Sequence, residues 1–358
     1  MTKRLICLVL CLAVCAGLFA GCAGEAGHPA GKSMKKYTAS WFDVFDTVTT
    51  VLGYAESQEE WDAQMAALHG DLVEYHKLFD IYHRYEGLVN LYQVNRQAAA
   101  APVPVDERIF DMLLEAVEME QLTGGKMNVA LGQVYKIWHQ AREAAEEDPA
   151  KAYVPDMADL QAAAQHGSME ALVLNQADKT IFFADPDLRL EVGSVGKGYA
   201  VEMAARAAQG RGLTSALISV GGNLRSIGTK PDGTRWTGGI QNPWLAPGEE
   251  GEAFLAAVEI EDMSLVTSGN YQRYYELGGV RYHHLIDPAT LMPANTFSAV
   301  AVLGPDSGLA DCLSTGLFCT DLESGRAIVE DLENVEAMWM LADGTVEYSS
   351  GFENHLKQ

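Results

Sequence analysis

The segment that decides the fold of this chain reads Leu190-Glu191-Val192-Gly193-Ser194-Val195-Gly196-Lys197-Gly198-Tyr199-Ala200. It follows a run of β-forming residues and leads into an alanine-rich stretch that ends near Gly210. Glycines let the backbone approach a ligand closely, and the start of a helix offers unpaired N–H groups to an anion. The segment therefore predicts a strand-to-helix turn able to bind phosphate. Taken alone, however, a tight turn with a surface lysine is the favoured interpretation.

This segment is not a Walker A loop. That loop has four residues between its glycines and a Ser or Thr after its lysine. Here two residues separate Gly193 from Gly196, and Gly198 follows Lys197.

The remaining pattern of strands and helices is typical of an α+β fold. Strands are expected at 42–51, 171–175, 180–184, 216–220, 224–227, 236–240, 253–260, 264–267, 298–303 and 336–341. Helices are expected at 57–79, 106–124, 135–147, 157–165, 197–210, 307–320 and 322–330, and residues 82–95 are expected to be irregular. We predict helices packed on a largely antiparallel sheet, in a single body that spans residues 41–358.

The N-terminal residues have the pattern of a targeting segment. Lys3 and Arg4 precede an apolar run from Leu5 to Phe19, which is too short for a membrane-spanning helix of about 20 apolar residues. The sequence Leu18-Phe19-Ala20-Gly21-Cys22 resembles a bacterial lipobox, which implies cleavage before Cys22 and lipidation of its thiol. We expect a signal peptide at 1–21, a flexible tether at 22–40 and an extracytoplasmic, lipid-anchored protein. A plain secreted protein is the alternative.

Charge and cysteine usage narrow the possible partners. The chain has 25 Lys and Arg against 49 Asp and Glu, a net charge of −24, which argues against nucleic acid as a partner. An anionic cofactor would need local cations or a metal. Beyond the N-terminal segment only Cys312 and Cys319 remain. Seven residues apart on a helix, they are separated by about 10 Å along its axis, too far for a disulfide. We expect buried free thiols.

A second candidate site lies at Asp311, Ser314 and Thr315. On a helix these positions are i, i+3 and i+4, so their oxygens share one face and suit a hard cation such as Mg²⁺. Alternatively, Asp311 caps a turn, and the two hydroxyls bond back to the helix backbone.

A third candidate site contains the adjacent histidines His283 and His284, followed by Asp287 and Pro288. Neighbouring residues of a strand point to opposite faces, so both histidines cannot bind one metal. His284 and Asp287 could supply an acid or base near a phosphoryl group. Neither a nucleophile elbow at Ser219 nor a Rossmann dinucleotide site is supported.

In this order the motifs resemble those of the ApbE family, the FAD:protein FMN transferases, over roughly residues 42–345. The matching segments are Phe45-Asp46-Thr47, Phe79-Asp80-Ile81-Tyr82 with Val94-Asn95, Thr123 to Gly132, Gly193 to Ala200 with Val220-Gly221-Gly222-Asn223, Thr267 to Tyr271, His284 to Pro288, and Ala310 to Thr315. Asn128 and Glu191 stand where the family usually has Asp.

The resemblance implies that FAD lies across the body with its pyrophosphate near Lys197 and Mg²⁺. The metal ligands would be the Ser194 carbonyl, Asp311 and Thr315, with Ser314 as a further candidate. The flavin and adenosine ends would contact Phe45, Tyr82, Lys126, Met127, Asn128, Glu191 and Ile286. His284 would act as the base for the incoming hydroxyl, because histidine can titrate near neutral pH.

The resemblance also implies the reaction and its partners. A threonine or serine hydroxyl of an extracytoplasmic acceptor flavoprotein would attack the FMN-side phosphorus of FAD, and AMP would leave. Two alternatives remain open at this point. One is a Mg²⁺-dependent FAD pyrophosphatase that transfers FMN to water, and the other is a lipoprotein that binds FAD without turnover.

Overall fold

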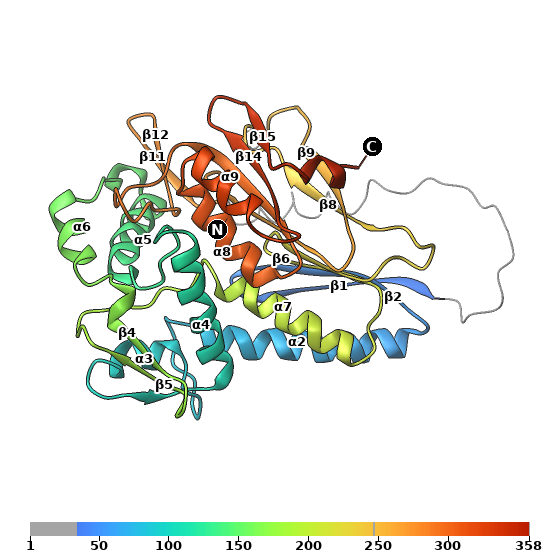
Figure 1. The fold of residues 1–358 in the computed structure, drawn as a ribbon, viewed down its shortest axis with the longest axis horizontal. Helices are drawn as coiled ribbons and strands as arrows, with labels where there is room; N and C mark the ends of the chain where they lie inside the picture. The colour runs from blue at the N-terminus through green and yellow to red at the C-terminus, as the bar shows by residue number, and fades with distance from the viewer. Residues whose placement is uncertain (1–33, 246–247, 358) are drawn as a thin grey trace, which may run out of the picture. The chain divides into compact units, whose positions relative to one another are not determined.

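An eight-stranded sheet forms the centre of the protein in the computed structural model, which describes residues 34–245 and 248–357 (Figure 1). The strands lie in the order β1-β2-β6-β7-β10-β13-β14-β15, and every neighbouring pair is antiparallel. Their bounds are β1 Lys35–Val44, β2 Thr47–Ala55, β6 Ala216–Val220, β7 Asn223–Ile227, β10 Ser264–Gly269, β13 Phe297–Gly304, β14 Glu336–Leu341 and β15 Val346–Tyr348. The expected α+β class is confirmed.

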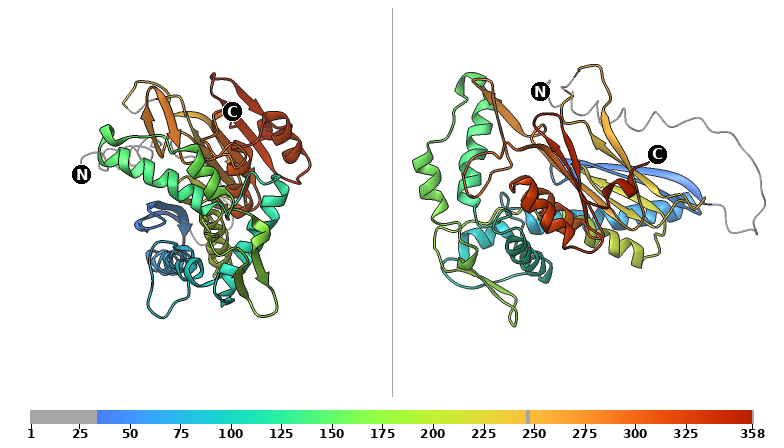
Figure 2. Two further views of the ribbon diagram at one scale, coloured as in Figure 1. Left: turned by 90° about the vertical axis from the view of Figure 1, so that its left-hand side faces the viewer. Right: turned by 45° about the horizontal axis from the view of Figure 1, so that its top comes forward.

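Helices cover one face of this sheet, as the two views in Figure 2 also show. They are α2 Gln58–Phe79, α7 Gly196–Gly210, α8 Ser307–Phe318 and α9 Leu322–Glu330. Apolar side chains of α2 and α7 pack against β1, β2 and β6, and those of α8 and α9 pack against β10, β13 and β14. Helix α7, which carries the glycine-rich motif of Lys197, and helix α8, which carries Asp311, therefore lie on the same face of the sheet.

Strand β13 is buried on both of its faces. Val300 and Val302 face the helices, whereas Ala299 and Ala301 face a hairpin of β8 (Trp236–Gln241) and β9 (Phe254–Ile260). All eight residues of the strand are buried. A continuous apolar run without alternation is the pattern expected of such a strand.

Smaller elements extend one end of the sheet (Figure 1). They comprise α3 Leu91–Gln97, β3 Val103–Pro104, α4 Glu107–Leu122, α5 Gly132–Glu147, η1 Pro149–Lys151, α6 Met157–Ala164, η2 Met169–Ala171, β4 Leu172–Asn175, β5 Thr180–Phe183, β11 Tyr274–Leu277 and β12 Val280–His283. A short η3, Phe352–His355, follows β15. The antiparallel hairpin β11–β12 packs on α5 through buried aromatic side chains. No helix of the described residues is long and apolar enough to span a membrane.

The expected strand at 42–51 is wrong, because two strands meet there at a tight turn. Phe45 and Asp46 both have positive φ, 53° and 49°. The Phe45 N–H donates to Nδ1 of His76 at 3.1 Å, which helps to hold the turn against α2. Neither Phe nor Asp at this position signals a two-residue hairpin turn as Asn-Gly or Asp-Gly would.

The expected tether is also too long, because β1 begins at Lys35. Tyr37 stacks on Trp61 at 5.7 Å between ring centroids, and Trp41 stacks on His69 at 4.9 Å. These aromatic contacts fix residues 35–40 on α2. The expected signal peptide and Cys22 lie outside the described residues.

Two further elements were not expected from the sequence. The region at 82–95 contains α3, which begins with a capping box between Asn90 and Gln93. The hairpin β11–β12 turns at Gly278 and Gly279. The prediction of free, buried thiols at Cys312 and Cys319 is confirmed.

Candidate functional site

The glycine-rich segment and the Asp311 helix meet at one junction. The N–H of Gly198, in the first turn of α7, donates to Oδ2 of Asp311 on α8 at 2.8 Å. A Cβ atom at position 198 would lie 2.3 Å from the Ser307 carbonyl oxygen and 2.4 Å from the Asp311 Cβ. Only glycine allows the two helices to approach this closely. The structure therefore brings together two motifs that are far apart in the sequence.

Lys197 is enclosed at this junction rather than displayed on the surface. Its side chain is 18% exposed, and its Nζ lies 3.6 Å from Oδ1 of Asp311. The ammonium also donates to Oδ1 of Asn223, at the start of β7. Burial lowers the pKa of Lys197, and the charge of Asp311 opposes that shift. The interpretation as a tight turn with a surface lysine is therefore wrong.

A buried carboxylate holds α7 and α8 together one turn further along α7. Glu202 is 0% exposed and accepts from Nε of Arg225 on β7 at 2.8 Å. It also accepts from the N–H of Ser307 at 2.9 Å, where α8 begins, and from Nε of Arg206 at 2.8 Å. One side chain thus fixes both helices and the adjacent strand around the junction.

The expected metal ligands differ in the hydrogen bonds that they already make within the protein. Ser314 Oγ donates to the Asp311 carbonyl at 2.9 Å and lies 2.8 Å from Ser268 Oγ on β10, so it bonds back to the helix as in the alternative interpretation. Thr315 Oγ1 has only a long contact of 3.5 Å with Ser268 Oγ. No described group donates to the Ser194 carbonyl, because Ser194 precedes the N-cap Val195, whose carbonyl accepts the first helical bond from the Tyr199 N–H.

The adjacent histidines lie in different surroundings, as strand alternation predicts. His283 is in the core, where its Nε2 donates to the Ala294 carbonyl at 2.8 Å and its Nδ1 accepts from the Leu285 N–H at 3.2 Å. The Nδ1 atom of His284 is buried without a partner. Burial lowers the pKa of His284 to about 3, and the charge of Arg273 contributes. The expectation that His284 titrates near neutral pH is wrong for the free protein.

Glu191 lies near two arginines that sequence reasoning missed. Its Oε1 accepts from the Gly193 N–H at 3.1 Å. Burial raises the pKa of Glu191, and the positive charges of Arg273 and Arg142 oppose that rise. The same two arginines act on His284. The chain is strongly acidic, so its few arginines were the sequence signal that could have pointed to groups binding phosphate.

Two aromatic side chains expected at the flavin are accessible to a ligand. The Phe45 ring, at the β1–β2 turn, is half-buried and meets His76 edge-on at 5.5 Å between ring centroids. Tyr82 is 57% exposed, and its ring centroid lies 6.1 Å from that of His139 on α5.

Lys126 borders a hollow that does not include Phe45 or Tyr82. Its Nζ donates to Oδ1 of Asp287 at 2.8 Å. Both residues line a hollow of about 500 Å³, which neither Lys197 nor Asp311 lines. Lys126 is therefore an ion-paired residue at the rim of a separate concavity.

The other three expected ligand contacts have mainly structural roles. The side chains of Met127 and Ile286 are buried in apolar clusters, which leaves only their backbone for a ligand. Both ends of the Asn128 amide are engaged within the protein, because Nδ2 donates to the Gly167 carbonyl at 3.0 Å and Oδ1 accepts from the Ala130 N–H at 2.8 Å.

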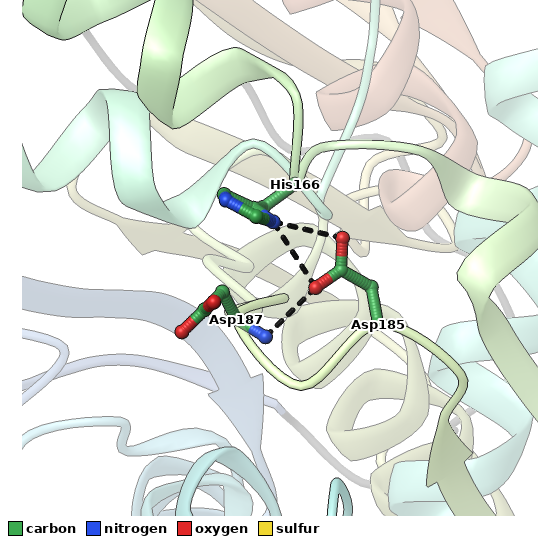
Figure 3. Close-up of side chains that lie close together, drawn as sticks. All are labelled: His166, Asp185 and Asp187. Atoms are coloured by element: carbon green, nitrogen blue, oxygen red, sulfur yellow. Dashed lines mark hydrogen bonds and ion pairs between the residues drawn. The ribbon is translucent and has the colours of Figure 1, made fainter.

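A separate group of potential metal ligands is formed by His166, Asp185 and Asp187 (Figure 3). Nδ1 of His166 lies 2.8 Å from Asp185 Oδ2, and Asp185 Oδ1 accepts from the Asp187 N–H at 2.8 Å. These bonds close the loop after β5, and we assign no metal to the group.

Comparison with known proteins gives consistent matches. A sequence model described as the ApbE family matches residues 45–339. The FAD:protein FMN transferase of Treponema pallidum (strain Nichols) is 31% identical over 278 residues, which cover 74% of this chain and 74% of that protein. The protein of the same name from Escherichia coli (strain K12) is 31% identical over 242 residues, or 67% of this chain and 66% of that protein.

Solved structures share the fold. The ApbE protein of Thermotoga maritima superposes with a TM-score of 0.78 at 22% identity, covering 90% of this chain and 100% of that one. The flavin transferase ApbE of Vibrio cholerae gives a TM-score of 0.75 at 23% identity, with the same coverage.

Proposed function

The chain belongs to the ApbE family, and on that premise we propose that it is a Mg²⁺-dependent FAD:protein FMN transferase. It transfers FMN from FAD to a threonine or serine hydroxyl of an extracytoplasmic acceptor flavoprotein, with release of AMP. The observation that carries the proposal is the approach of Lys197 Nζ to within 3.6 Å of Asp311 Oδ1 at the α7–α8 junction. A cation for phosphate oxygens and a carboxylate for a metal are thereby held side by side.

Three oxygens at this junction fit a magnesium ion. They are the Ser194 carbonyl, to which no described group donates, Oδ1 of Asp311 and Oγ1 of Thr315. Mg²⁺ prefers such oxygens and takes few from the protein, completing its shell with water and phosphate. When bound, the ion neutralises charge on the pyrophosphate oxygens. Ser314 supports this set by holding the Asp311 backbone.

Lys197 binds the phosphates of FAD. Its ammonium is held by Asn223 and Asp311, so it loses little conformational freedom when the anion arrives. Burial strengthens its interaction with a phosphate oxygen, because fewer water molecules screen the charges.

His284 accepts the proton of the attacking hydroxyl. In the free protein it is neutral, and its buried Nδ1 has no partner, so a lone pair is available. An anionic substrate beside the ring favours the protonated form and raises its basicity above that of the free protein. The accessible rings of Phe45 and Tyr82 offer apolar surface to the flavin.

One experiment tests the function against both alternatives. The mature protein is incubated with FAD, Mg²⁺ and a candidate acceptor domain, and flavin fluorescence is measured on the denatured acceptor. A transferase labels the acceptor and releases one AMP per label, and chelation of Mg²⁺ by EDTA stops both. Free FMN and AMP without labelling would instead indicate a pyrophosphatase. Unchanged FAD, bound at one equivalent, would leave only a binding protein.

We also propose that the protein is anchored to the membrane by a lipid on Cys22. The support is the lipobox-like sequence Leu18 to Cys22, which lies outside the described residues. Cys22→Ser should release the protein from the membrane fraction of the expressing cells, or leave it as an uncleaved precursor. A wild-type protein that is recovered without detergent and without a lipid mass would contradict the anchor.

A further inference from the structure

Arg273 and His284 lie next to each other at the open end of the β11–β12 hairpin. Its register pairs Leu277 with Val280, Glu276 with Arg281, Tyr275 with Tyr282 and Tyr274 with His283. Arg273 immediately precedes β11 and His284 immediately follows β12, so the two residues flank the last pair of this register. Continuing the alternation of the strands by one residue at each of these ends puts both side chains on one side of the hairpin.

Aromatic contacts identify this side of the hairpin. The rings of Tyr275 and Tyr282 stack at 5.3 Å, and Tyr282 stacks on Trp138 of α5 at 5.9 Å between centroids. Arg273 and His284 are each two residues away from these tyrosines, so they share the face that meets α5. Figure 1 shows the hairpin lying beside α5.

The charge of Arg273 reaches the ionisable groups of the candidate site. Burial is the main cause of the shifted pKa values of Glu191, Lys197 and His284. The positive charge of Arg273 adds to the lowering of the pKa of Lys197 and of His284, and it opposes the rise of the pKa of Glu191. Within the part of the chain that the structure describes, no carboxylate lies at salt-bridge distance from its guanidinium. The side chain is exposed. Arg273 is therefore a cation beside the site that forms no salt bridge with the described carboxylates.

From this placement we propose that Arg273 is a further catalytic residue, which binds the phosphate oxygens of FAD and of the AMP that leaves. The inference rests on the proposed transferase function. A guanidinium presents its donors as a planar fork that matches two phosphate oxygens at once. On a chain of net charge −24, binding of a pyrophosphate depends on such local cations.

The role follows from where charge develops in the reaction. The acceptor hydroxyl oxygen forms a bond to the FMN-side phosphorus, and the bond from that phosphorus to the bridging oxygen breaks. AMP leaves with the bridging oxygen and the electron pair, and the hydroxyl proton passes to His284. Negative charge grows on the leaving phosphate, where a fixed guanidinium stabilises it most. Arg273 itself forms and breaks no covalent bond.

The test compares Arg273→Ala and Arg273→Lys with a matched control, Arg281→Ala. Arg281 is on the other face of the same hairpin, over the Tyr274 ring at 4.2 Å and 3.4 Å from Glu276. FMN transfer is measured with saturating FAD, and equilibrium binding of FAD and riboflavin is measured by flavin fluorescence. Riboflavin carries the same ring but no phosphate.

Arg273→Ala should lower kcat about 100-fold and weaken FAD binding about tenfold, while riboflavin binding stays within about twofold of wild type. Arg273→Lys should recover part of kcat, and Arg281→Ala should behave as wild type. Equal losses for FAD and riboflavin would overturn the proposal, as would unchanged FAD binding and kcat. If the wild-type protein transfers no FMN, the proposed function fails. The comparison of FAD with riboflavin then still decides whether Arg273 binds phosphate.

Discussion

The backbone N–H of Gly198 donates a 2.8 Å hydrogen bond to Oδ2 of Asp311, 113 residues later in the chain. This bond satisfies one of the unpaired N–H groups in the first turn of α7 and leaves the other carboxylate oxygen facing Lys197. A single contact between two helices thus orients one of the oxygens proposed to bind Mg²⁺.

Gly198→Ala should separate the two helices. The added Cβ would lie 2.3 Å from the Ser307 carbonyl oxygen, and that backbone cannot move aside without shifting α8. We expect a loss of about 1–3 kcal/mol in the free energy of unfolding and about 100-fold in kcat. Gly210→Ala, at the other end of α7, is the control, because a Cβ added there would have no atom within 4 Å. It should be neutral or stabilising in urea titrations, and equal losses in both variants would contradict the packing argument.

Asp311→Asn should weaken Mg²⁺ binding while preserving the fold. The amide oxygen can still accept from Gly198, but the negative charge that attracts Mg²⁺ is gone. We expect FMN transfer to fall at least about 100-fold and the Mg²⁺ concentration for half-maximal rate to rise. Asp306→Asn, which alters the N-cap of the same helix, should keep its activity because Asn also caps helices well. A wild-type Mg²⁺ response in the Asp311 variant would refute the metal assignment.

Glu115→Gln should stabilise the protein increasingly as pH rises. Burial raises the pKa of Glu115 on α4 to about 8 from 4.5, with Asp306, Glu118 and Glu202 adding to the shift and Arg206 opposing it. Between these values the unfolded chain ionises this carboxyl and the folded protein does not, so wild-type stability falls with rising pH. The variant lacks this loss, so its stability relative to wild type should rise by about 3–4 kcal/mol between pH 5 and pH 8.

Urea denaturation at pH 5 and pH 8 measures this difference. Glu118→Gln, which removes an exposed negative charge from the same helix, is the control. A gain of equal size in that variant, or a gain that does not grow with pH, would show that Glu115 is not the cause.

His283→Gln should reduce the sensitivity of the fold to acid. Burial lowers the pKa of His283 to about 4 from 6.5. Below pH 6.5 the unfolded chain binds a proton that the native protein does not, so stability is lost as pH falls toward 4. Through this pKa difference, His283 lowers the free energy of unfolding by about 2 kcal/mol between pH 7 and pH 5. The variant should be less stable than wild type at pH 7 but lose less on acidification. Parallel pH profiles would exclude His283 as the cause.

Local sequence patterns predicted the elements that carry the site. The helix after Ser57 begins as expected, with the Ser57 side chain accepting from the Glu60 N–H, because capping depends on residues three apart. The helix of Asp311 was predicted for the same reason, since helical spacing is a local property. The family motifs added the association of Lys197 with Asp311, which no local pattern contains.

What the sequence did not reveal depends on contacts between distant segments. The sequence suggested Ser314 as a metal ligand, but its hydroxyl donates to the Asp311 carbonyl. Whether the hydroxyl binds a metal or the helix backbone depends on the packing of the folded helix beside β10, where Ser268 contacts it. The turn at Phe45 was hidden because its backbone conformation is stabilised by His76 of another element. Arg273 could have been found, because Gly278-Gly279 is a two-residue hairpin turn that fixes the register up to His284.

The buried Glu202 has a consequence for motion. Separating α7 from α8 would strip this buried carboxylate of the donor from Ser307, and lifting α7 from the sheet would also strip it of the donors from Arg225, which is a costly local change. Opening of the junction is therefore coupled to unfolding of the whole sheet. Hydrogen exchange at the Gly198 amide should be as slow as that of the most protected core amides. An acceptor protein must then reach a pre-formed, rigid centre, and the adjustments that admit it belong to the surrounding loops.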